Sequence, residues 1–208
     1  MAVYYDYETV HRKISVADQV TIPLNGTDYT FDVIGFNHDA EFGGNSITGC
    51  AGITFQMHDC FATTYPMNST NTNSGGWHKS NMRDSTMMTM ARYMPTAWQN
   101  IIRQVKKPSG TGGGSTSGIN ISSDYCFLLA EIEIFGSISN SVSGEGTQYA
   151  YYKAGNSKVK NVGGSAAYWW ERSPRSDSSA YFCGVHKWGG AYAGDASNAL
   201  GVAFGFCV

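Results

Sequence analysis

Hydrophobic and polar positions alternate in short runs along the N-terminal third of the chain, which is typical of β-strands. The segments QVTIPL at residues 19–24 and YTFDVIGF at residues 29–36 flank the turn NGTD. Because Asn-Gly accepts positive φ angles at little cost, this pattern predicts a β-hairpin. A further extended segment is expected at residues 51–67, followed by a polar loop at residues 68–80.

A helical pattern replaces the alternation in the middle of the chain. The first predicted helix, residues 80–94, is rich in methionine, and its apolar face consists of Met87, Met90, Ala91 and Met94. The second predicted helix begins at Pro95 and ends at Pro108. Lys106 and Lys107 would complement the negative end of its dipole. Its apolar stripe follows the i, i+3, i+4, i+7 spacing and consists of Trp98, Ile101, Ile102 and Val105.

The second half of the chain returns to extended patterns. The Gly- and Ser-rich stretch 109–123 suggests a long surface loop, or alternatively a domain linker. A strongly apolar, central strand is predicted at residues 124–136, and residues 145–160 are expected to be extended or to form a short helix. Three further strands are predicted at residues 166–173, 180–187 and 201–208.

Composition narrows the class of protein. The chain has 208 residues, which suits a single domain over residues 1–208. Hydrophobic residues make up 42% and charged residues 14%, unlike a disordered chain. A formal net charge of −2 argues against nucleic-acid binding. We expect no membrane insertion, since no run of about 18 residues is apolar, and the N-terminus lacks the apolar segment of a signal peptide.

The five cysteines are odd in number and widely spaced, which argues against a disulfide framework. We interpret them as free and mostly buried thiols. They are Cys50, Cys60, Cys126, Cys183 and Cys207.

Sequence signatures of catalysis are missing. The chain has no phosphate-binding loop, no nucleophile elbow and no zinc motif. Two His-Asp pairs, at residues 38–39 and 58–59, are the best metal candidates, but structural hydrogen bonding is favoured over a metal site. Glu131 and Glu133 would share one face of a strand, where we expect them to bind turn amides or pair with Arg172 rather than act as catalysts. We therefore predict no catalytic residue, no metal and no cofactor.

Three places in the chain carry a resemblance to a known family. They are the segment 62–83, the segments FLLAEIEIFGS and GEGTQYAYYKAGNSKVK, and YWWERSP with the terminal GVAFGFCV. Together they resemble a large family of bacterial and phage domains with a Trp-Trp-x-Arg-Ser-Pro signature. The similarity covers nearly the whole chain beyond about residue 15.

This resemblance implies a C-type-lectin-like fold, in the broad sense shared with formylglycine-generating enzymes. It also implies a relation to the variable proteins of diversity-generating retroelements, which are common in gut phages and gut bacteria. In those systems a reverse transcriptase copies a template with errors at adenines and overwrites the 3′ end of the target gene. A C-terminal segment thereby varies while its framework stays fixed.

The resemblance gives residues 171–198 the role of a variable surface on a fixed framework, with at least one of Trp169 and Trp170 in the core. Aromatics separated by Gly and Ser are typical of paratopes, although composition alone would fit ordinary strand and loop residues equally well. The expected ligand-binding positions are Glu171, Arg175, Asp177, Ser178, Ser179, Tyr181, Val185, His186, Lys187, Trp188, Ala191, Tyr192 and Asp195.

Two departures limit what the resemblance implies. The calcium-dependent sugar motifs of lectins are missing. Formylglycine-generating enzymes use a pair of closely placed cysteines, whereas Cys183 and Cys207 lie 24 positions apart. The expected fold therefore comes without either activity.

The resulting expectation is a non-enzymatic protein that binds a protein or glycan receptor on a bacterial surface. It would be made in the bacterial cytoplasm and belong to a phage tail in the virion, with homotrimers possible in a tail fibre. A bacterial cell-surface location is the alternative. The other functions considered are a structural virion or assembly protein and an enzyme of the formylglycine-generating type.

Overall fold

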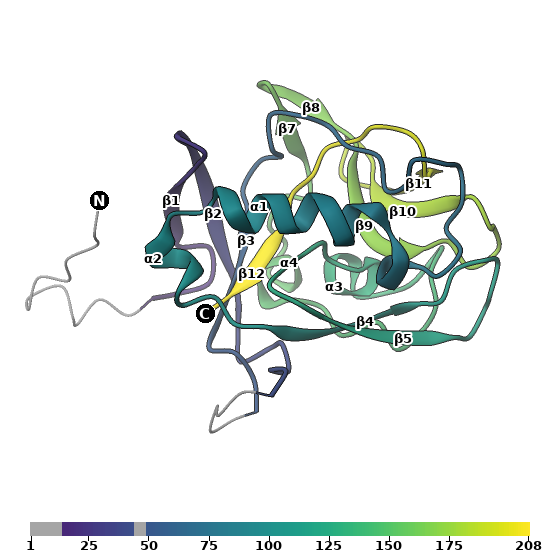
Figure 1. The fold of residues 1–208 in the computed structure, drawn as a ribbon, viewed down its shortest axis with the longest axis horizontal. Coiled ribbons are helices and arrows are strands. Elements are labelled where there is room, and N and C mark those ends of the chain that lie inside the picture. Colours follow the sequence, from purple (N-terminus) through teal and green to yellow (C-terminus); the bar gives the residue numbers. More distant parts are fainter. Residues whose placement is uncertain (1–13, 44–48) are drawn as a thin grey trace, which may run out of the picture.

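The computed structural model describes residues 14–43 and 49–208 (Figure 1). Antiparallel strand pairs and a few short helices make up this part of the chain, which confirms the α+β class. The expectation of a missing signal peptide falls on residues 1–13, which lie outside the described residues. None of the described helices is long and apolar enough to cross a membrane.

Five strands form the largest sheet, and the C-terminal strand lies inside it rather than at its edge (Figure 1). The order is β1 (Gln19–Leu24), β2 (Thr27–Phe36), β3 (Ile53–Met57), β12 (Gly205–Cys207) and β6 (Cys126–Phe127). Because β12 pairs with β3 on one side and β6 on the other, the end of the chain joins its first and middle thirds.

Smaller sheets carry the rest of the strands. One has the order β11 (Ala191–Asp195), β10 (Tyr181–Val185) and β9 (Trp169–Pro174). The others are the pairs β4 (Val105–Gly110) with β5 (Ile119–Asp124) and β7 (Lys160–Val162) with β8 (Ser165–Ala167).

Short helices connect these sheets. They are the 3-10 helix η2 (Trp77–Lys79), the π-helix η3 (Met82–Met87), α1 (Met88–Tyr93), α2 (Thr96–Gln99), α3 (Glu131–Phe135) and α4 (Ala150–Lys153).

The N-terminal hairpin and the methionine-rich helix are confirmed. Strands β1 and β2 pair from Leu24 opposite Thr27, and the two residues between them, Asn25 and Gly26, have φ values of 47° and 83°. These left-handed conformations are the ones that Asn-Gly adopts readily. The predicted helix at residues 80–94 appears as η3 continuing into α1, and its methionine face is buried.

The second predicted helix is wrong. Only α2 is helical; Ile101 of the expected apolar stripe is 49% exposed, and β4 begins at Val105. Along β4 burial alternates, with Lys106 exposed and Lys107 buried. Lys107 therefore points into the protein, where partners distant in sequence neutralise it, instead of capping a helix. Pro108 is tolerated because β4 pairs with a single strand, β5, so no second ladder needs its missing N–H.

Two other predictions need correction. The apolar run at residues 124–136 contains the short strand β6 and then α3, so Glu131 and Glu133 lie on a helix rather than on a strand face. The Gly- and Ser-rich stretch 109–123 is the tip and return strand of the β4–β5 hairpin. Of the C-terminal strands, β9, β10 and β12 were predicted, while β11 was not.

Tryptophan and phenylalanine are prominent among the largest buried side chains of the core. Trp169 and Trp170 are both fully buried, and each donates its indole N–H to a backbone carbonyl, of Lys158 at 2.9 Å and of Tyr65 at 2.8 Å. In the large sheet, the ring of Phe206 lies 5.2 Å from that of Phe55. None of the five cysteines forms a disulfide, as predicted, and all of them except Cys50 are buried.

We expect Trp169→Ala and Trp170→Ala each to lower the free energy of unfolding by about 3–5 kcal/mol, because each removes a large buried side chain. Trp188→Ala is the matched control, since Trp188 is 72% exposed and should change stability by less than about 0.5 kcal/mol. Urea unfolding of the three variants measures this. Equal midpoints for Trp170→Ala and Trp188→Ala would contradict the assignment of the core.

Candidate functional site

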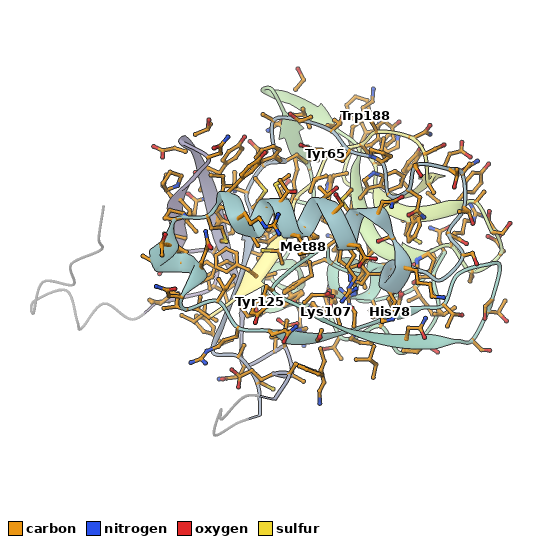
Figure 2. All side chains as sticks on the ribbon, in the orientation of Figure 1. Tyr65, His78, Met88, Lys107, Tyr125 and Trp188 are labelled. Carbon is orange, nitrogen blue, oxygen red and sulfur yellow. The ribbon has the colours of Figure 1, made fainter. Side chains whose placement is uncertain are left out.

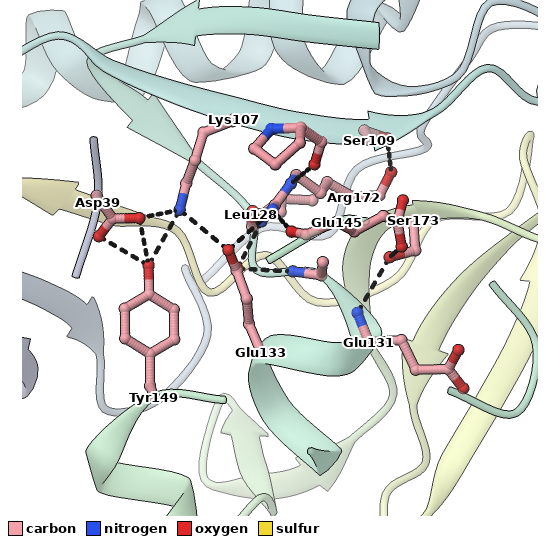
Figure 3. A network of polar contacts seen from close by, with 12 residues as sticks. Asp39, Lys107, Ser109, Leu128, Glu131, Glu133, Glu145, Tyr149, Arg172 and Ser173 are labelled. Carbon is pink, nitrogen blue, oxygen red and sulfur yellow. Dashed lines mark hydrogen bonds and ion pairs between the residues drawn. The ribbon is translucent and has the colours of Figure 1, made fainter. Parts of the chain in front are cut away.

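Strand β9 precedes most of the expected binding positions in the chain, and all six of its residues are buried. Arg172 on this strand uses all five of its N–H donors inside the protein (Figure 3). Two of them form a paired contact with the carboxylate of Glu133, at 2.5 and 2.8 Å. The others bind the backbone carbonyls of Pro108, Leu128 and Glu145.

A second buried cation continues this network. The Lys107 ammonium donates to Asp39 at 2.5 Å, to Glu133 at 3.3 Å and to the hydroxyl of Tyr149 at 3.0 Å, which uses its three protons (Figure 3). The Tyr149 hydroxyl lies 2.9 Å from both oxygens of Asp39. We call this group of side chains the ion network; it consists of Asp39, Lys107, Glu133, Arg172 and Tyr149.

Electrostatics within the ion network favour the charged carboxylates. Burial alone would raise the pKa of Asp39, but the Lys107 ammonium and His38 outweigh burial and lower that pKa well below its usual range. Burial likewise opposes ionisation of Glu133, yet Arg172 and Lys107 lower the pKa of Glu133. The expectation that Glu133 pairs with Arg172 is therefore confirmed.

The other buried glutamates around β9 serve local structure. Glu131 accepts hydrogen bonds from the backbone amides of Ser139, Asn140 and Ser141, as its expected role with turn amides predicted. Glu145 accepts from the Gly110 amide at 2.8 Å and from the Ser173 hydroxyl at 2.6 Å, and burial raises its pKa.

Glu171 and Val185 do not belong to a surface, which corrects two of the expected ligand-binding positions. Both are 0% exposed, because β9 and β10 are covered on both faces and their alternate residues have no solvent side. Neither carboxylate oxygen of Glu171 has a hydrogen-bond partner. Burial, followed by the charges of Glu131 and Glu145, raises the pKa of Glu171 well above its ordinary value.

The eleven remaining expected positions retain solvent contact and fall into two groups. One group lies beyond the start of β10 and includes Arg175 and Asp177, whose side chains pair at 2.5 Å. The other lies at the β10–β11 turn, at the opposite end of β10. The eleven are Arg175, Asp177, Ser178, Ser179, Tyr181, His186, Lys187, Trp188, Ala191, Tyr192 and Asp195.

An aromatic patch lies at the β10–β11 turn and consists of Tyr168, His186, Trp188 and Tyr192. The ring of Tyr168 is 4.5 Å from His186 and 4.6 Å from Tyr192, and Trp188 is 6.0 Å from His186. Lys187 lies over the Trp188 ring at 4.6 Å. Tyr168, which directly precedes the two core tryptophans, is half-buried and was not among the expected positions.

Hydrogen bonds fix the turn that presents the patch. The His186 amide donates to the Gly190 carbonyl at 2.7 Å, and the Trp188 amide donates to Nδ1 of His186 at 3.2 Å. A neutral His186 ring therefore carries its proton on Nε2, which lies 2.8 Å from the Tyr168 hydroxyl. Gly189 has a φ of 86°, a conformation that favours glycine. Trp188 consequently projects into solvent from a rigid support (Figure 2).

The polar loop at residues 68–80 secures the other end of the surface. Asn73 is fully buried, and its side-chain amide donates to the carbonyls of Ser178 and Tyr181 at 2.8 and 2.6 Å. Its side-chain oxygen accepts from the Gly113 amide at 2.7 Å. Asn71 binds Asp195 at 2.5 Å. These supports were not predicted, because nothing near residues 71–73 in sequence indicates such distant partners.

The two His-Asp pairs make structural contacts rather than one joint site. His58 Nδ1 lies 2.9 Å from a carboxylate oxygen of Asp32, and the His38 ring stacks on Tyr149 at 3.9 Å. Within residues 14–43 and 49–208, no group of three or more His, Cys, Asp or Glu side chains could hold a metal ion. Burial raises the pKa of the Cys183 and Cys207 thiols well above the ordinary value, which keeps both protonated.

A family described as a domain of unknown function, DUF6273, matches residues 51–208 of the chain. The matched residues include the whole of β9, the ion-network residues from Lys107 onward and the aromatic patch. The chain belongs to this family. No curated protein and no solved structure matches the chain. The family description assigns no activity, so the functional argument depends on the geometry of the site.

Opposite effects are expected from the same substitution at two buried glutamates. Glu133→Gln should lower the free energy of unfolding by about 3–5 kcal/mol at neutral pH, because it breaks a buried ion pair. Glu171→Gln should raise the melting temperature at pH 8. The raised pKa of Glu171 means that the folded protein keeps a proton which the unfolded chain releases above about pH 4.3, so the stabilising contribution of Glu171 is lost as the pH rises.

Thermal unfolding of both variants between pH 5 and pH 8 checks these signs. The advantage of Glu171→Gln over the wild type should shrink toward pH 5. A lower melting temperature for Glu171→Gln than for the wild type at pH 8 would contradict the description of Glu171 as an unpartnered buried acid.

Proposed function

We propose that the protein is a non-enzymatic binding protein of C-type-lectin-like fold whose aromatic patch and adjoining loops contact a receptor. The observation that carries the proposal is the aromatic patch itself, with Trp188 72% exposed at a turn fixed by hydrogen bonds. A largely exposed indole contributes little to folding, whereas an aromatic anchor contributes contact area to binding at low entropic cost.

The separation of buried framework residues from solvent-exposed residues supports the role of a variable surface. Buried framework residues such as Arg172 and Asn73 form their hydrogen bonds inside the protein. The eleven outward residues between Arg175 and Asn198 retain solvent contact, and substitutions at such positions usually change stability by less than about 0.5 kcal/mol. Such a surface can change its sequence without loss of the fold, which a diversity-generating retroelement would require.

Binding is favoured over catalysis by the location of the titratable groups. The carboxylates and cations whose pKa values are most displaced, including Asp39, Glu171 and Arg172, lie in the interior, where a substrate has no access. The aromatic patch contains one titratable pair, Tyr168 and His186, already joined by a hydrogen bond.

The partner that fits this proposal is a protein or glycan receptor on a bacterial surface. Stacking on Trp188 and Tyr192 suits either a sugar ring or an apolar side chain. We propose that the protein belongs to a phage tail in the virion, where a tail fibre would present several copies of the patch in a homotrimer.

Labelled protein incubated with a panel of intact bacterial strains should reveal at least one strain that it binds. Trp188→Ala and Tyr192→Ala should then weaken binding about tenfold or more, because aromatic hot spots contribute about 2 kcal/mol or more each. Ile121→Ser is the control, since Ile121 is an exposed apolar residue of β5 outside the patch. Undiminished binding by both aromatic variants would refute the proposed site.

Diversification has a separate test in the genome. The gene should lie beside a reverse-transcriptase gene and a near-copy of the segment that encodes residues 171–198, with differences at template adenines. Related phages that carry identical sequences across this segment and no reverse transcriptase would contradict this part of the proposal.

A further inference from the structure

A pocket outside the aromatic patch lies between the η3–α1 helix and the segment that joins β5 to β6. Its volume is about 340 Å³. This value falls at the lower end of the range for small-molecule sites, about 300–1,000 Å³. One wall comes from residues 83–92 and the other from residues 123–126. Figure 2 labels one residue on each wall, Met88 on the helix and Tyr125 on the facing segment.

The apolar lining of this pocket is exposed to an unusual degree. Met88 is 52% exposed and Tyr125 is 49% exposed, and both face the pocket together with Met87 and Ala91. The neighbouring methionines 87, 90 and 94 are buried in the core, so Met88 is the methionine of this segment that remains exposed. Exposed apolar side chains gathered around a hollow are typical of ligand sites.

The charges in the wall are neutralised internally, with one exception. Arg83 donates to Asp124 at 2.6 Å and to Asp84 at 2.9 Å. Asp124 in turn accepts from the indole of Trp77 and from the hydroxyl of Ser122. Arg92 lies at the rim, is exposed, and its guanidinium has no hydrogen bond or ion pair with any residue that the structure describes.

The helical wall has an uncommon backbone. Residues Met82–Met87 form a π-helix that continues directly into α1. Segments of this kind occur preferentially at functional sites, because they cost stability relative to an α-helix. Here the π-helix supplies Arg83, Asp84 and Met87 to the pocket.

We propose that this pocket binds a small molecule with an apolar, flat or aliphatic body and a single anionic head group. The body would lie between Met88 and Tyr125, and the head would pair with Arg92, the cation of this pocket that has no partner among the described residues. The proposal is independent of receptor binding at the aromatic patch.

The probe for the test is 2-naphthoate, with the neutral 2-naphthamide as its isosteric partner, both titrated into the full chain by calorimetry at low salt. We expect saturable binding of 2-naphthoate and at least severalfold weaker binding of 2-naphthamide, since a guanidinium–carboxylate contact exceeds a neutral hydrogen bond in strength. Amide chemical-shift changes on titration should concentrate in residues 83–92 and 123–126.

Variants separate the two parts of the ligand. Arg92→Gln should weaken 2-naphthoate about threefold to tenfold and leave 2-naphthamide unchanged, whereas Tyr125→Ser should weaken both. Arg103→Gln is the matched control, because Arg103 is also an exposed arginine but does not line the pocket. Trp188→Ala should leave the binding of both probes unchanged, whatever it does to receptor binding.

Several results would overturn the proposal. They are no saturable binding of 2-naphthoate at millimolar concentration, equal affinity for the acid and the amide, an unchanged affinity in Arg92→Gln, or shift changes outside the two walls. Sedimentation that shows a dimer dissociated by Tyr125→Ser would assign this face to a second copy of the chain instead.

Discussion

The ion network of Asp39, Lys107, Glu133 and Arg172 is the constraint on which the rest of the structure depends. Removal of four charged groups from water costs several kcal/mol for each ion, and only complete pairing offsets this cost. Here the pairing is complete, with every N–H of Arg172 and Lys107 engaged. A partly formed network would leave a buried charge, so the competing packings of these segments are strongly disfavoured.

The four residues come from segments distant in sequence, and the network therefore fixes how those segments are arranged. Asp39 follows β2, Lys107 lies on β4, Glu133 lies on α3, and Arg172 lies on β9. We regard arrangement, rather than net stability, as the main contribution of the network, because well-packed apolar side chains could match it in energy.

Strand β9 connects the ion network to the proposed binding surface. Arg172 of this strand belongs to the ion network, and the first two residues of the strand, Trp169 and Trp170, are buried in the core. Its partner β10 leads directly into the turn that presents Trp188. The proposed binding surface thus lies one strand away from Arg172 and the ion network.

Local chemistry allowed part of this structure to be predicted. The β1–β2 hairpin follows from Asn25-Gly26 and alternation, and the buried face of η3–α1 follows from the methionine spacing. The pairing of Glu133 with Arg172 was also expected, although on a strand instead of a helix.

The errors arise where distant partners override local pattern. The sequence of residues 95–108 has a helical pattern. Lys107 is nevertheless buried, where it pairs with Asp39 and Glu133, and its segment is a strand in which burial alternates. The resemblance places Glu171 and Val185 on a surface, whereas β9 and β10 are covered on both faces and both residues are buried. The local sequence of a strand does not indicate which of its faces a segment distant in sequence will cover.

The most direct test of a fixed framework beneath a variable surface is a pooled single-substitution library over residues 171–198, sorted by folding and by binding to a captured bacterial strain. We expect Arg172 and Val185 to tolerate few substitutions in the folding sort, and Glu171 to tolerate few besides Gln. The eleven solvent-accessible positions should tolerate most substitutions, while Trp188 and Tyr192 control the binding sort. If those eleven positions were as intolerant for folding as Arg172, the segment would be framework throughout and the account would be wrong.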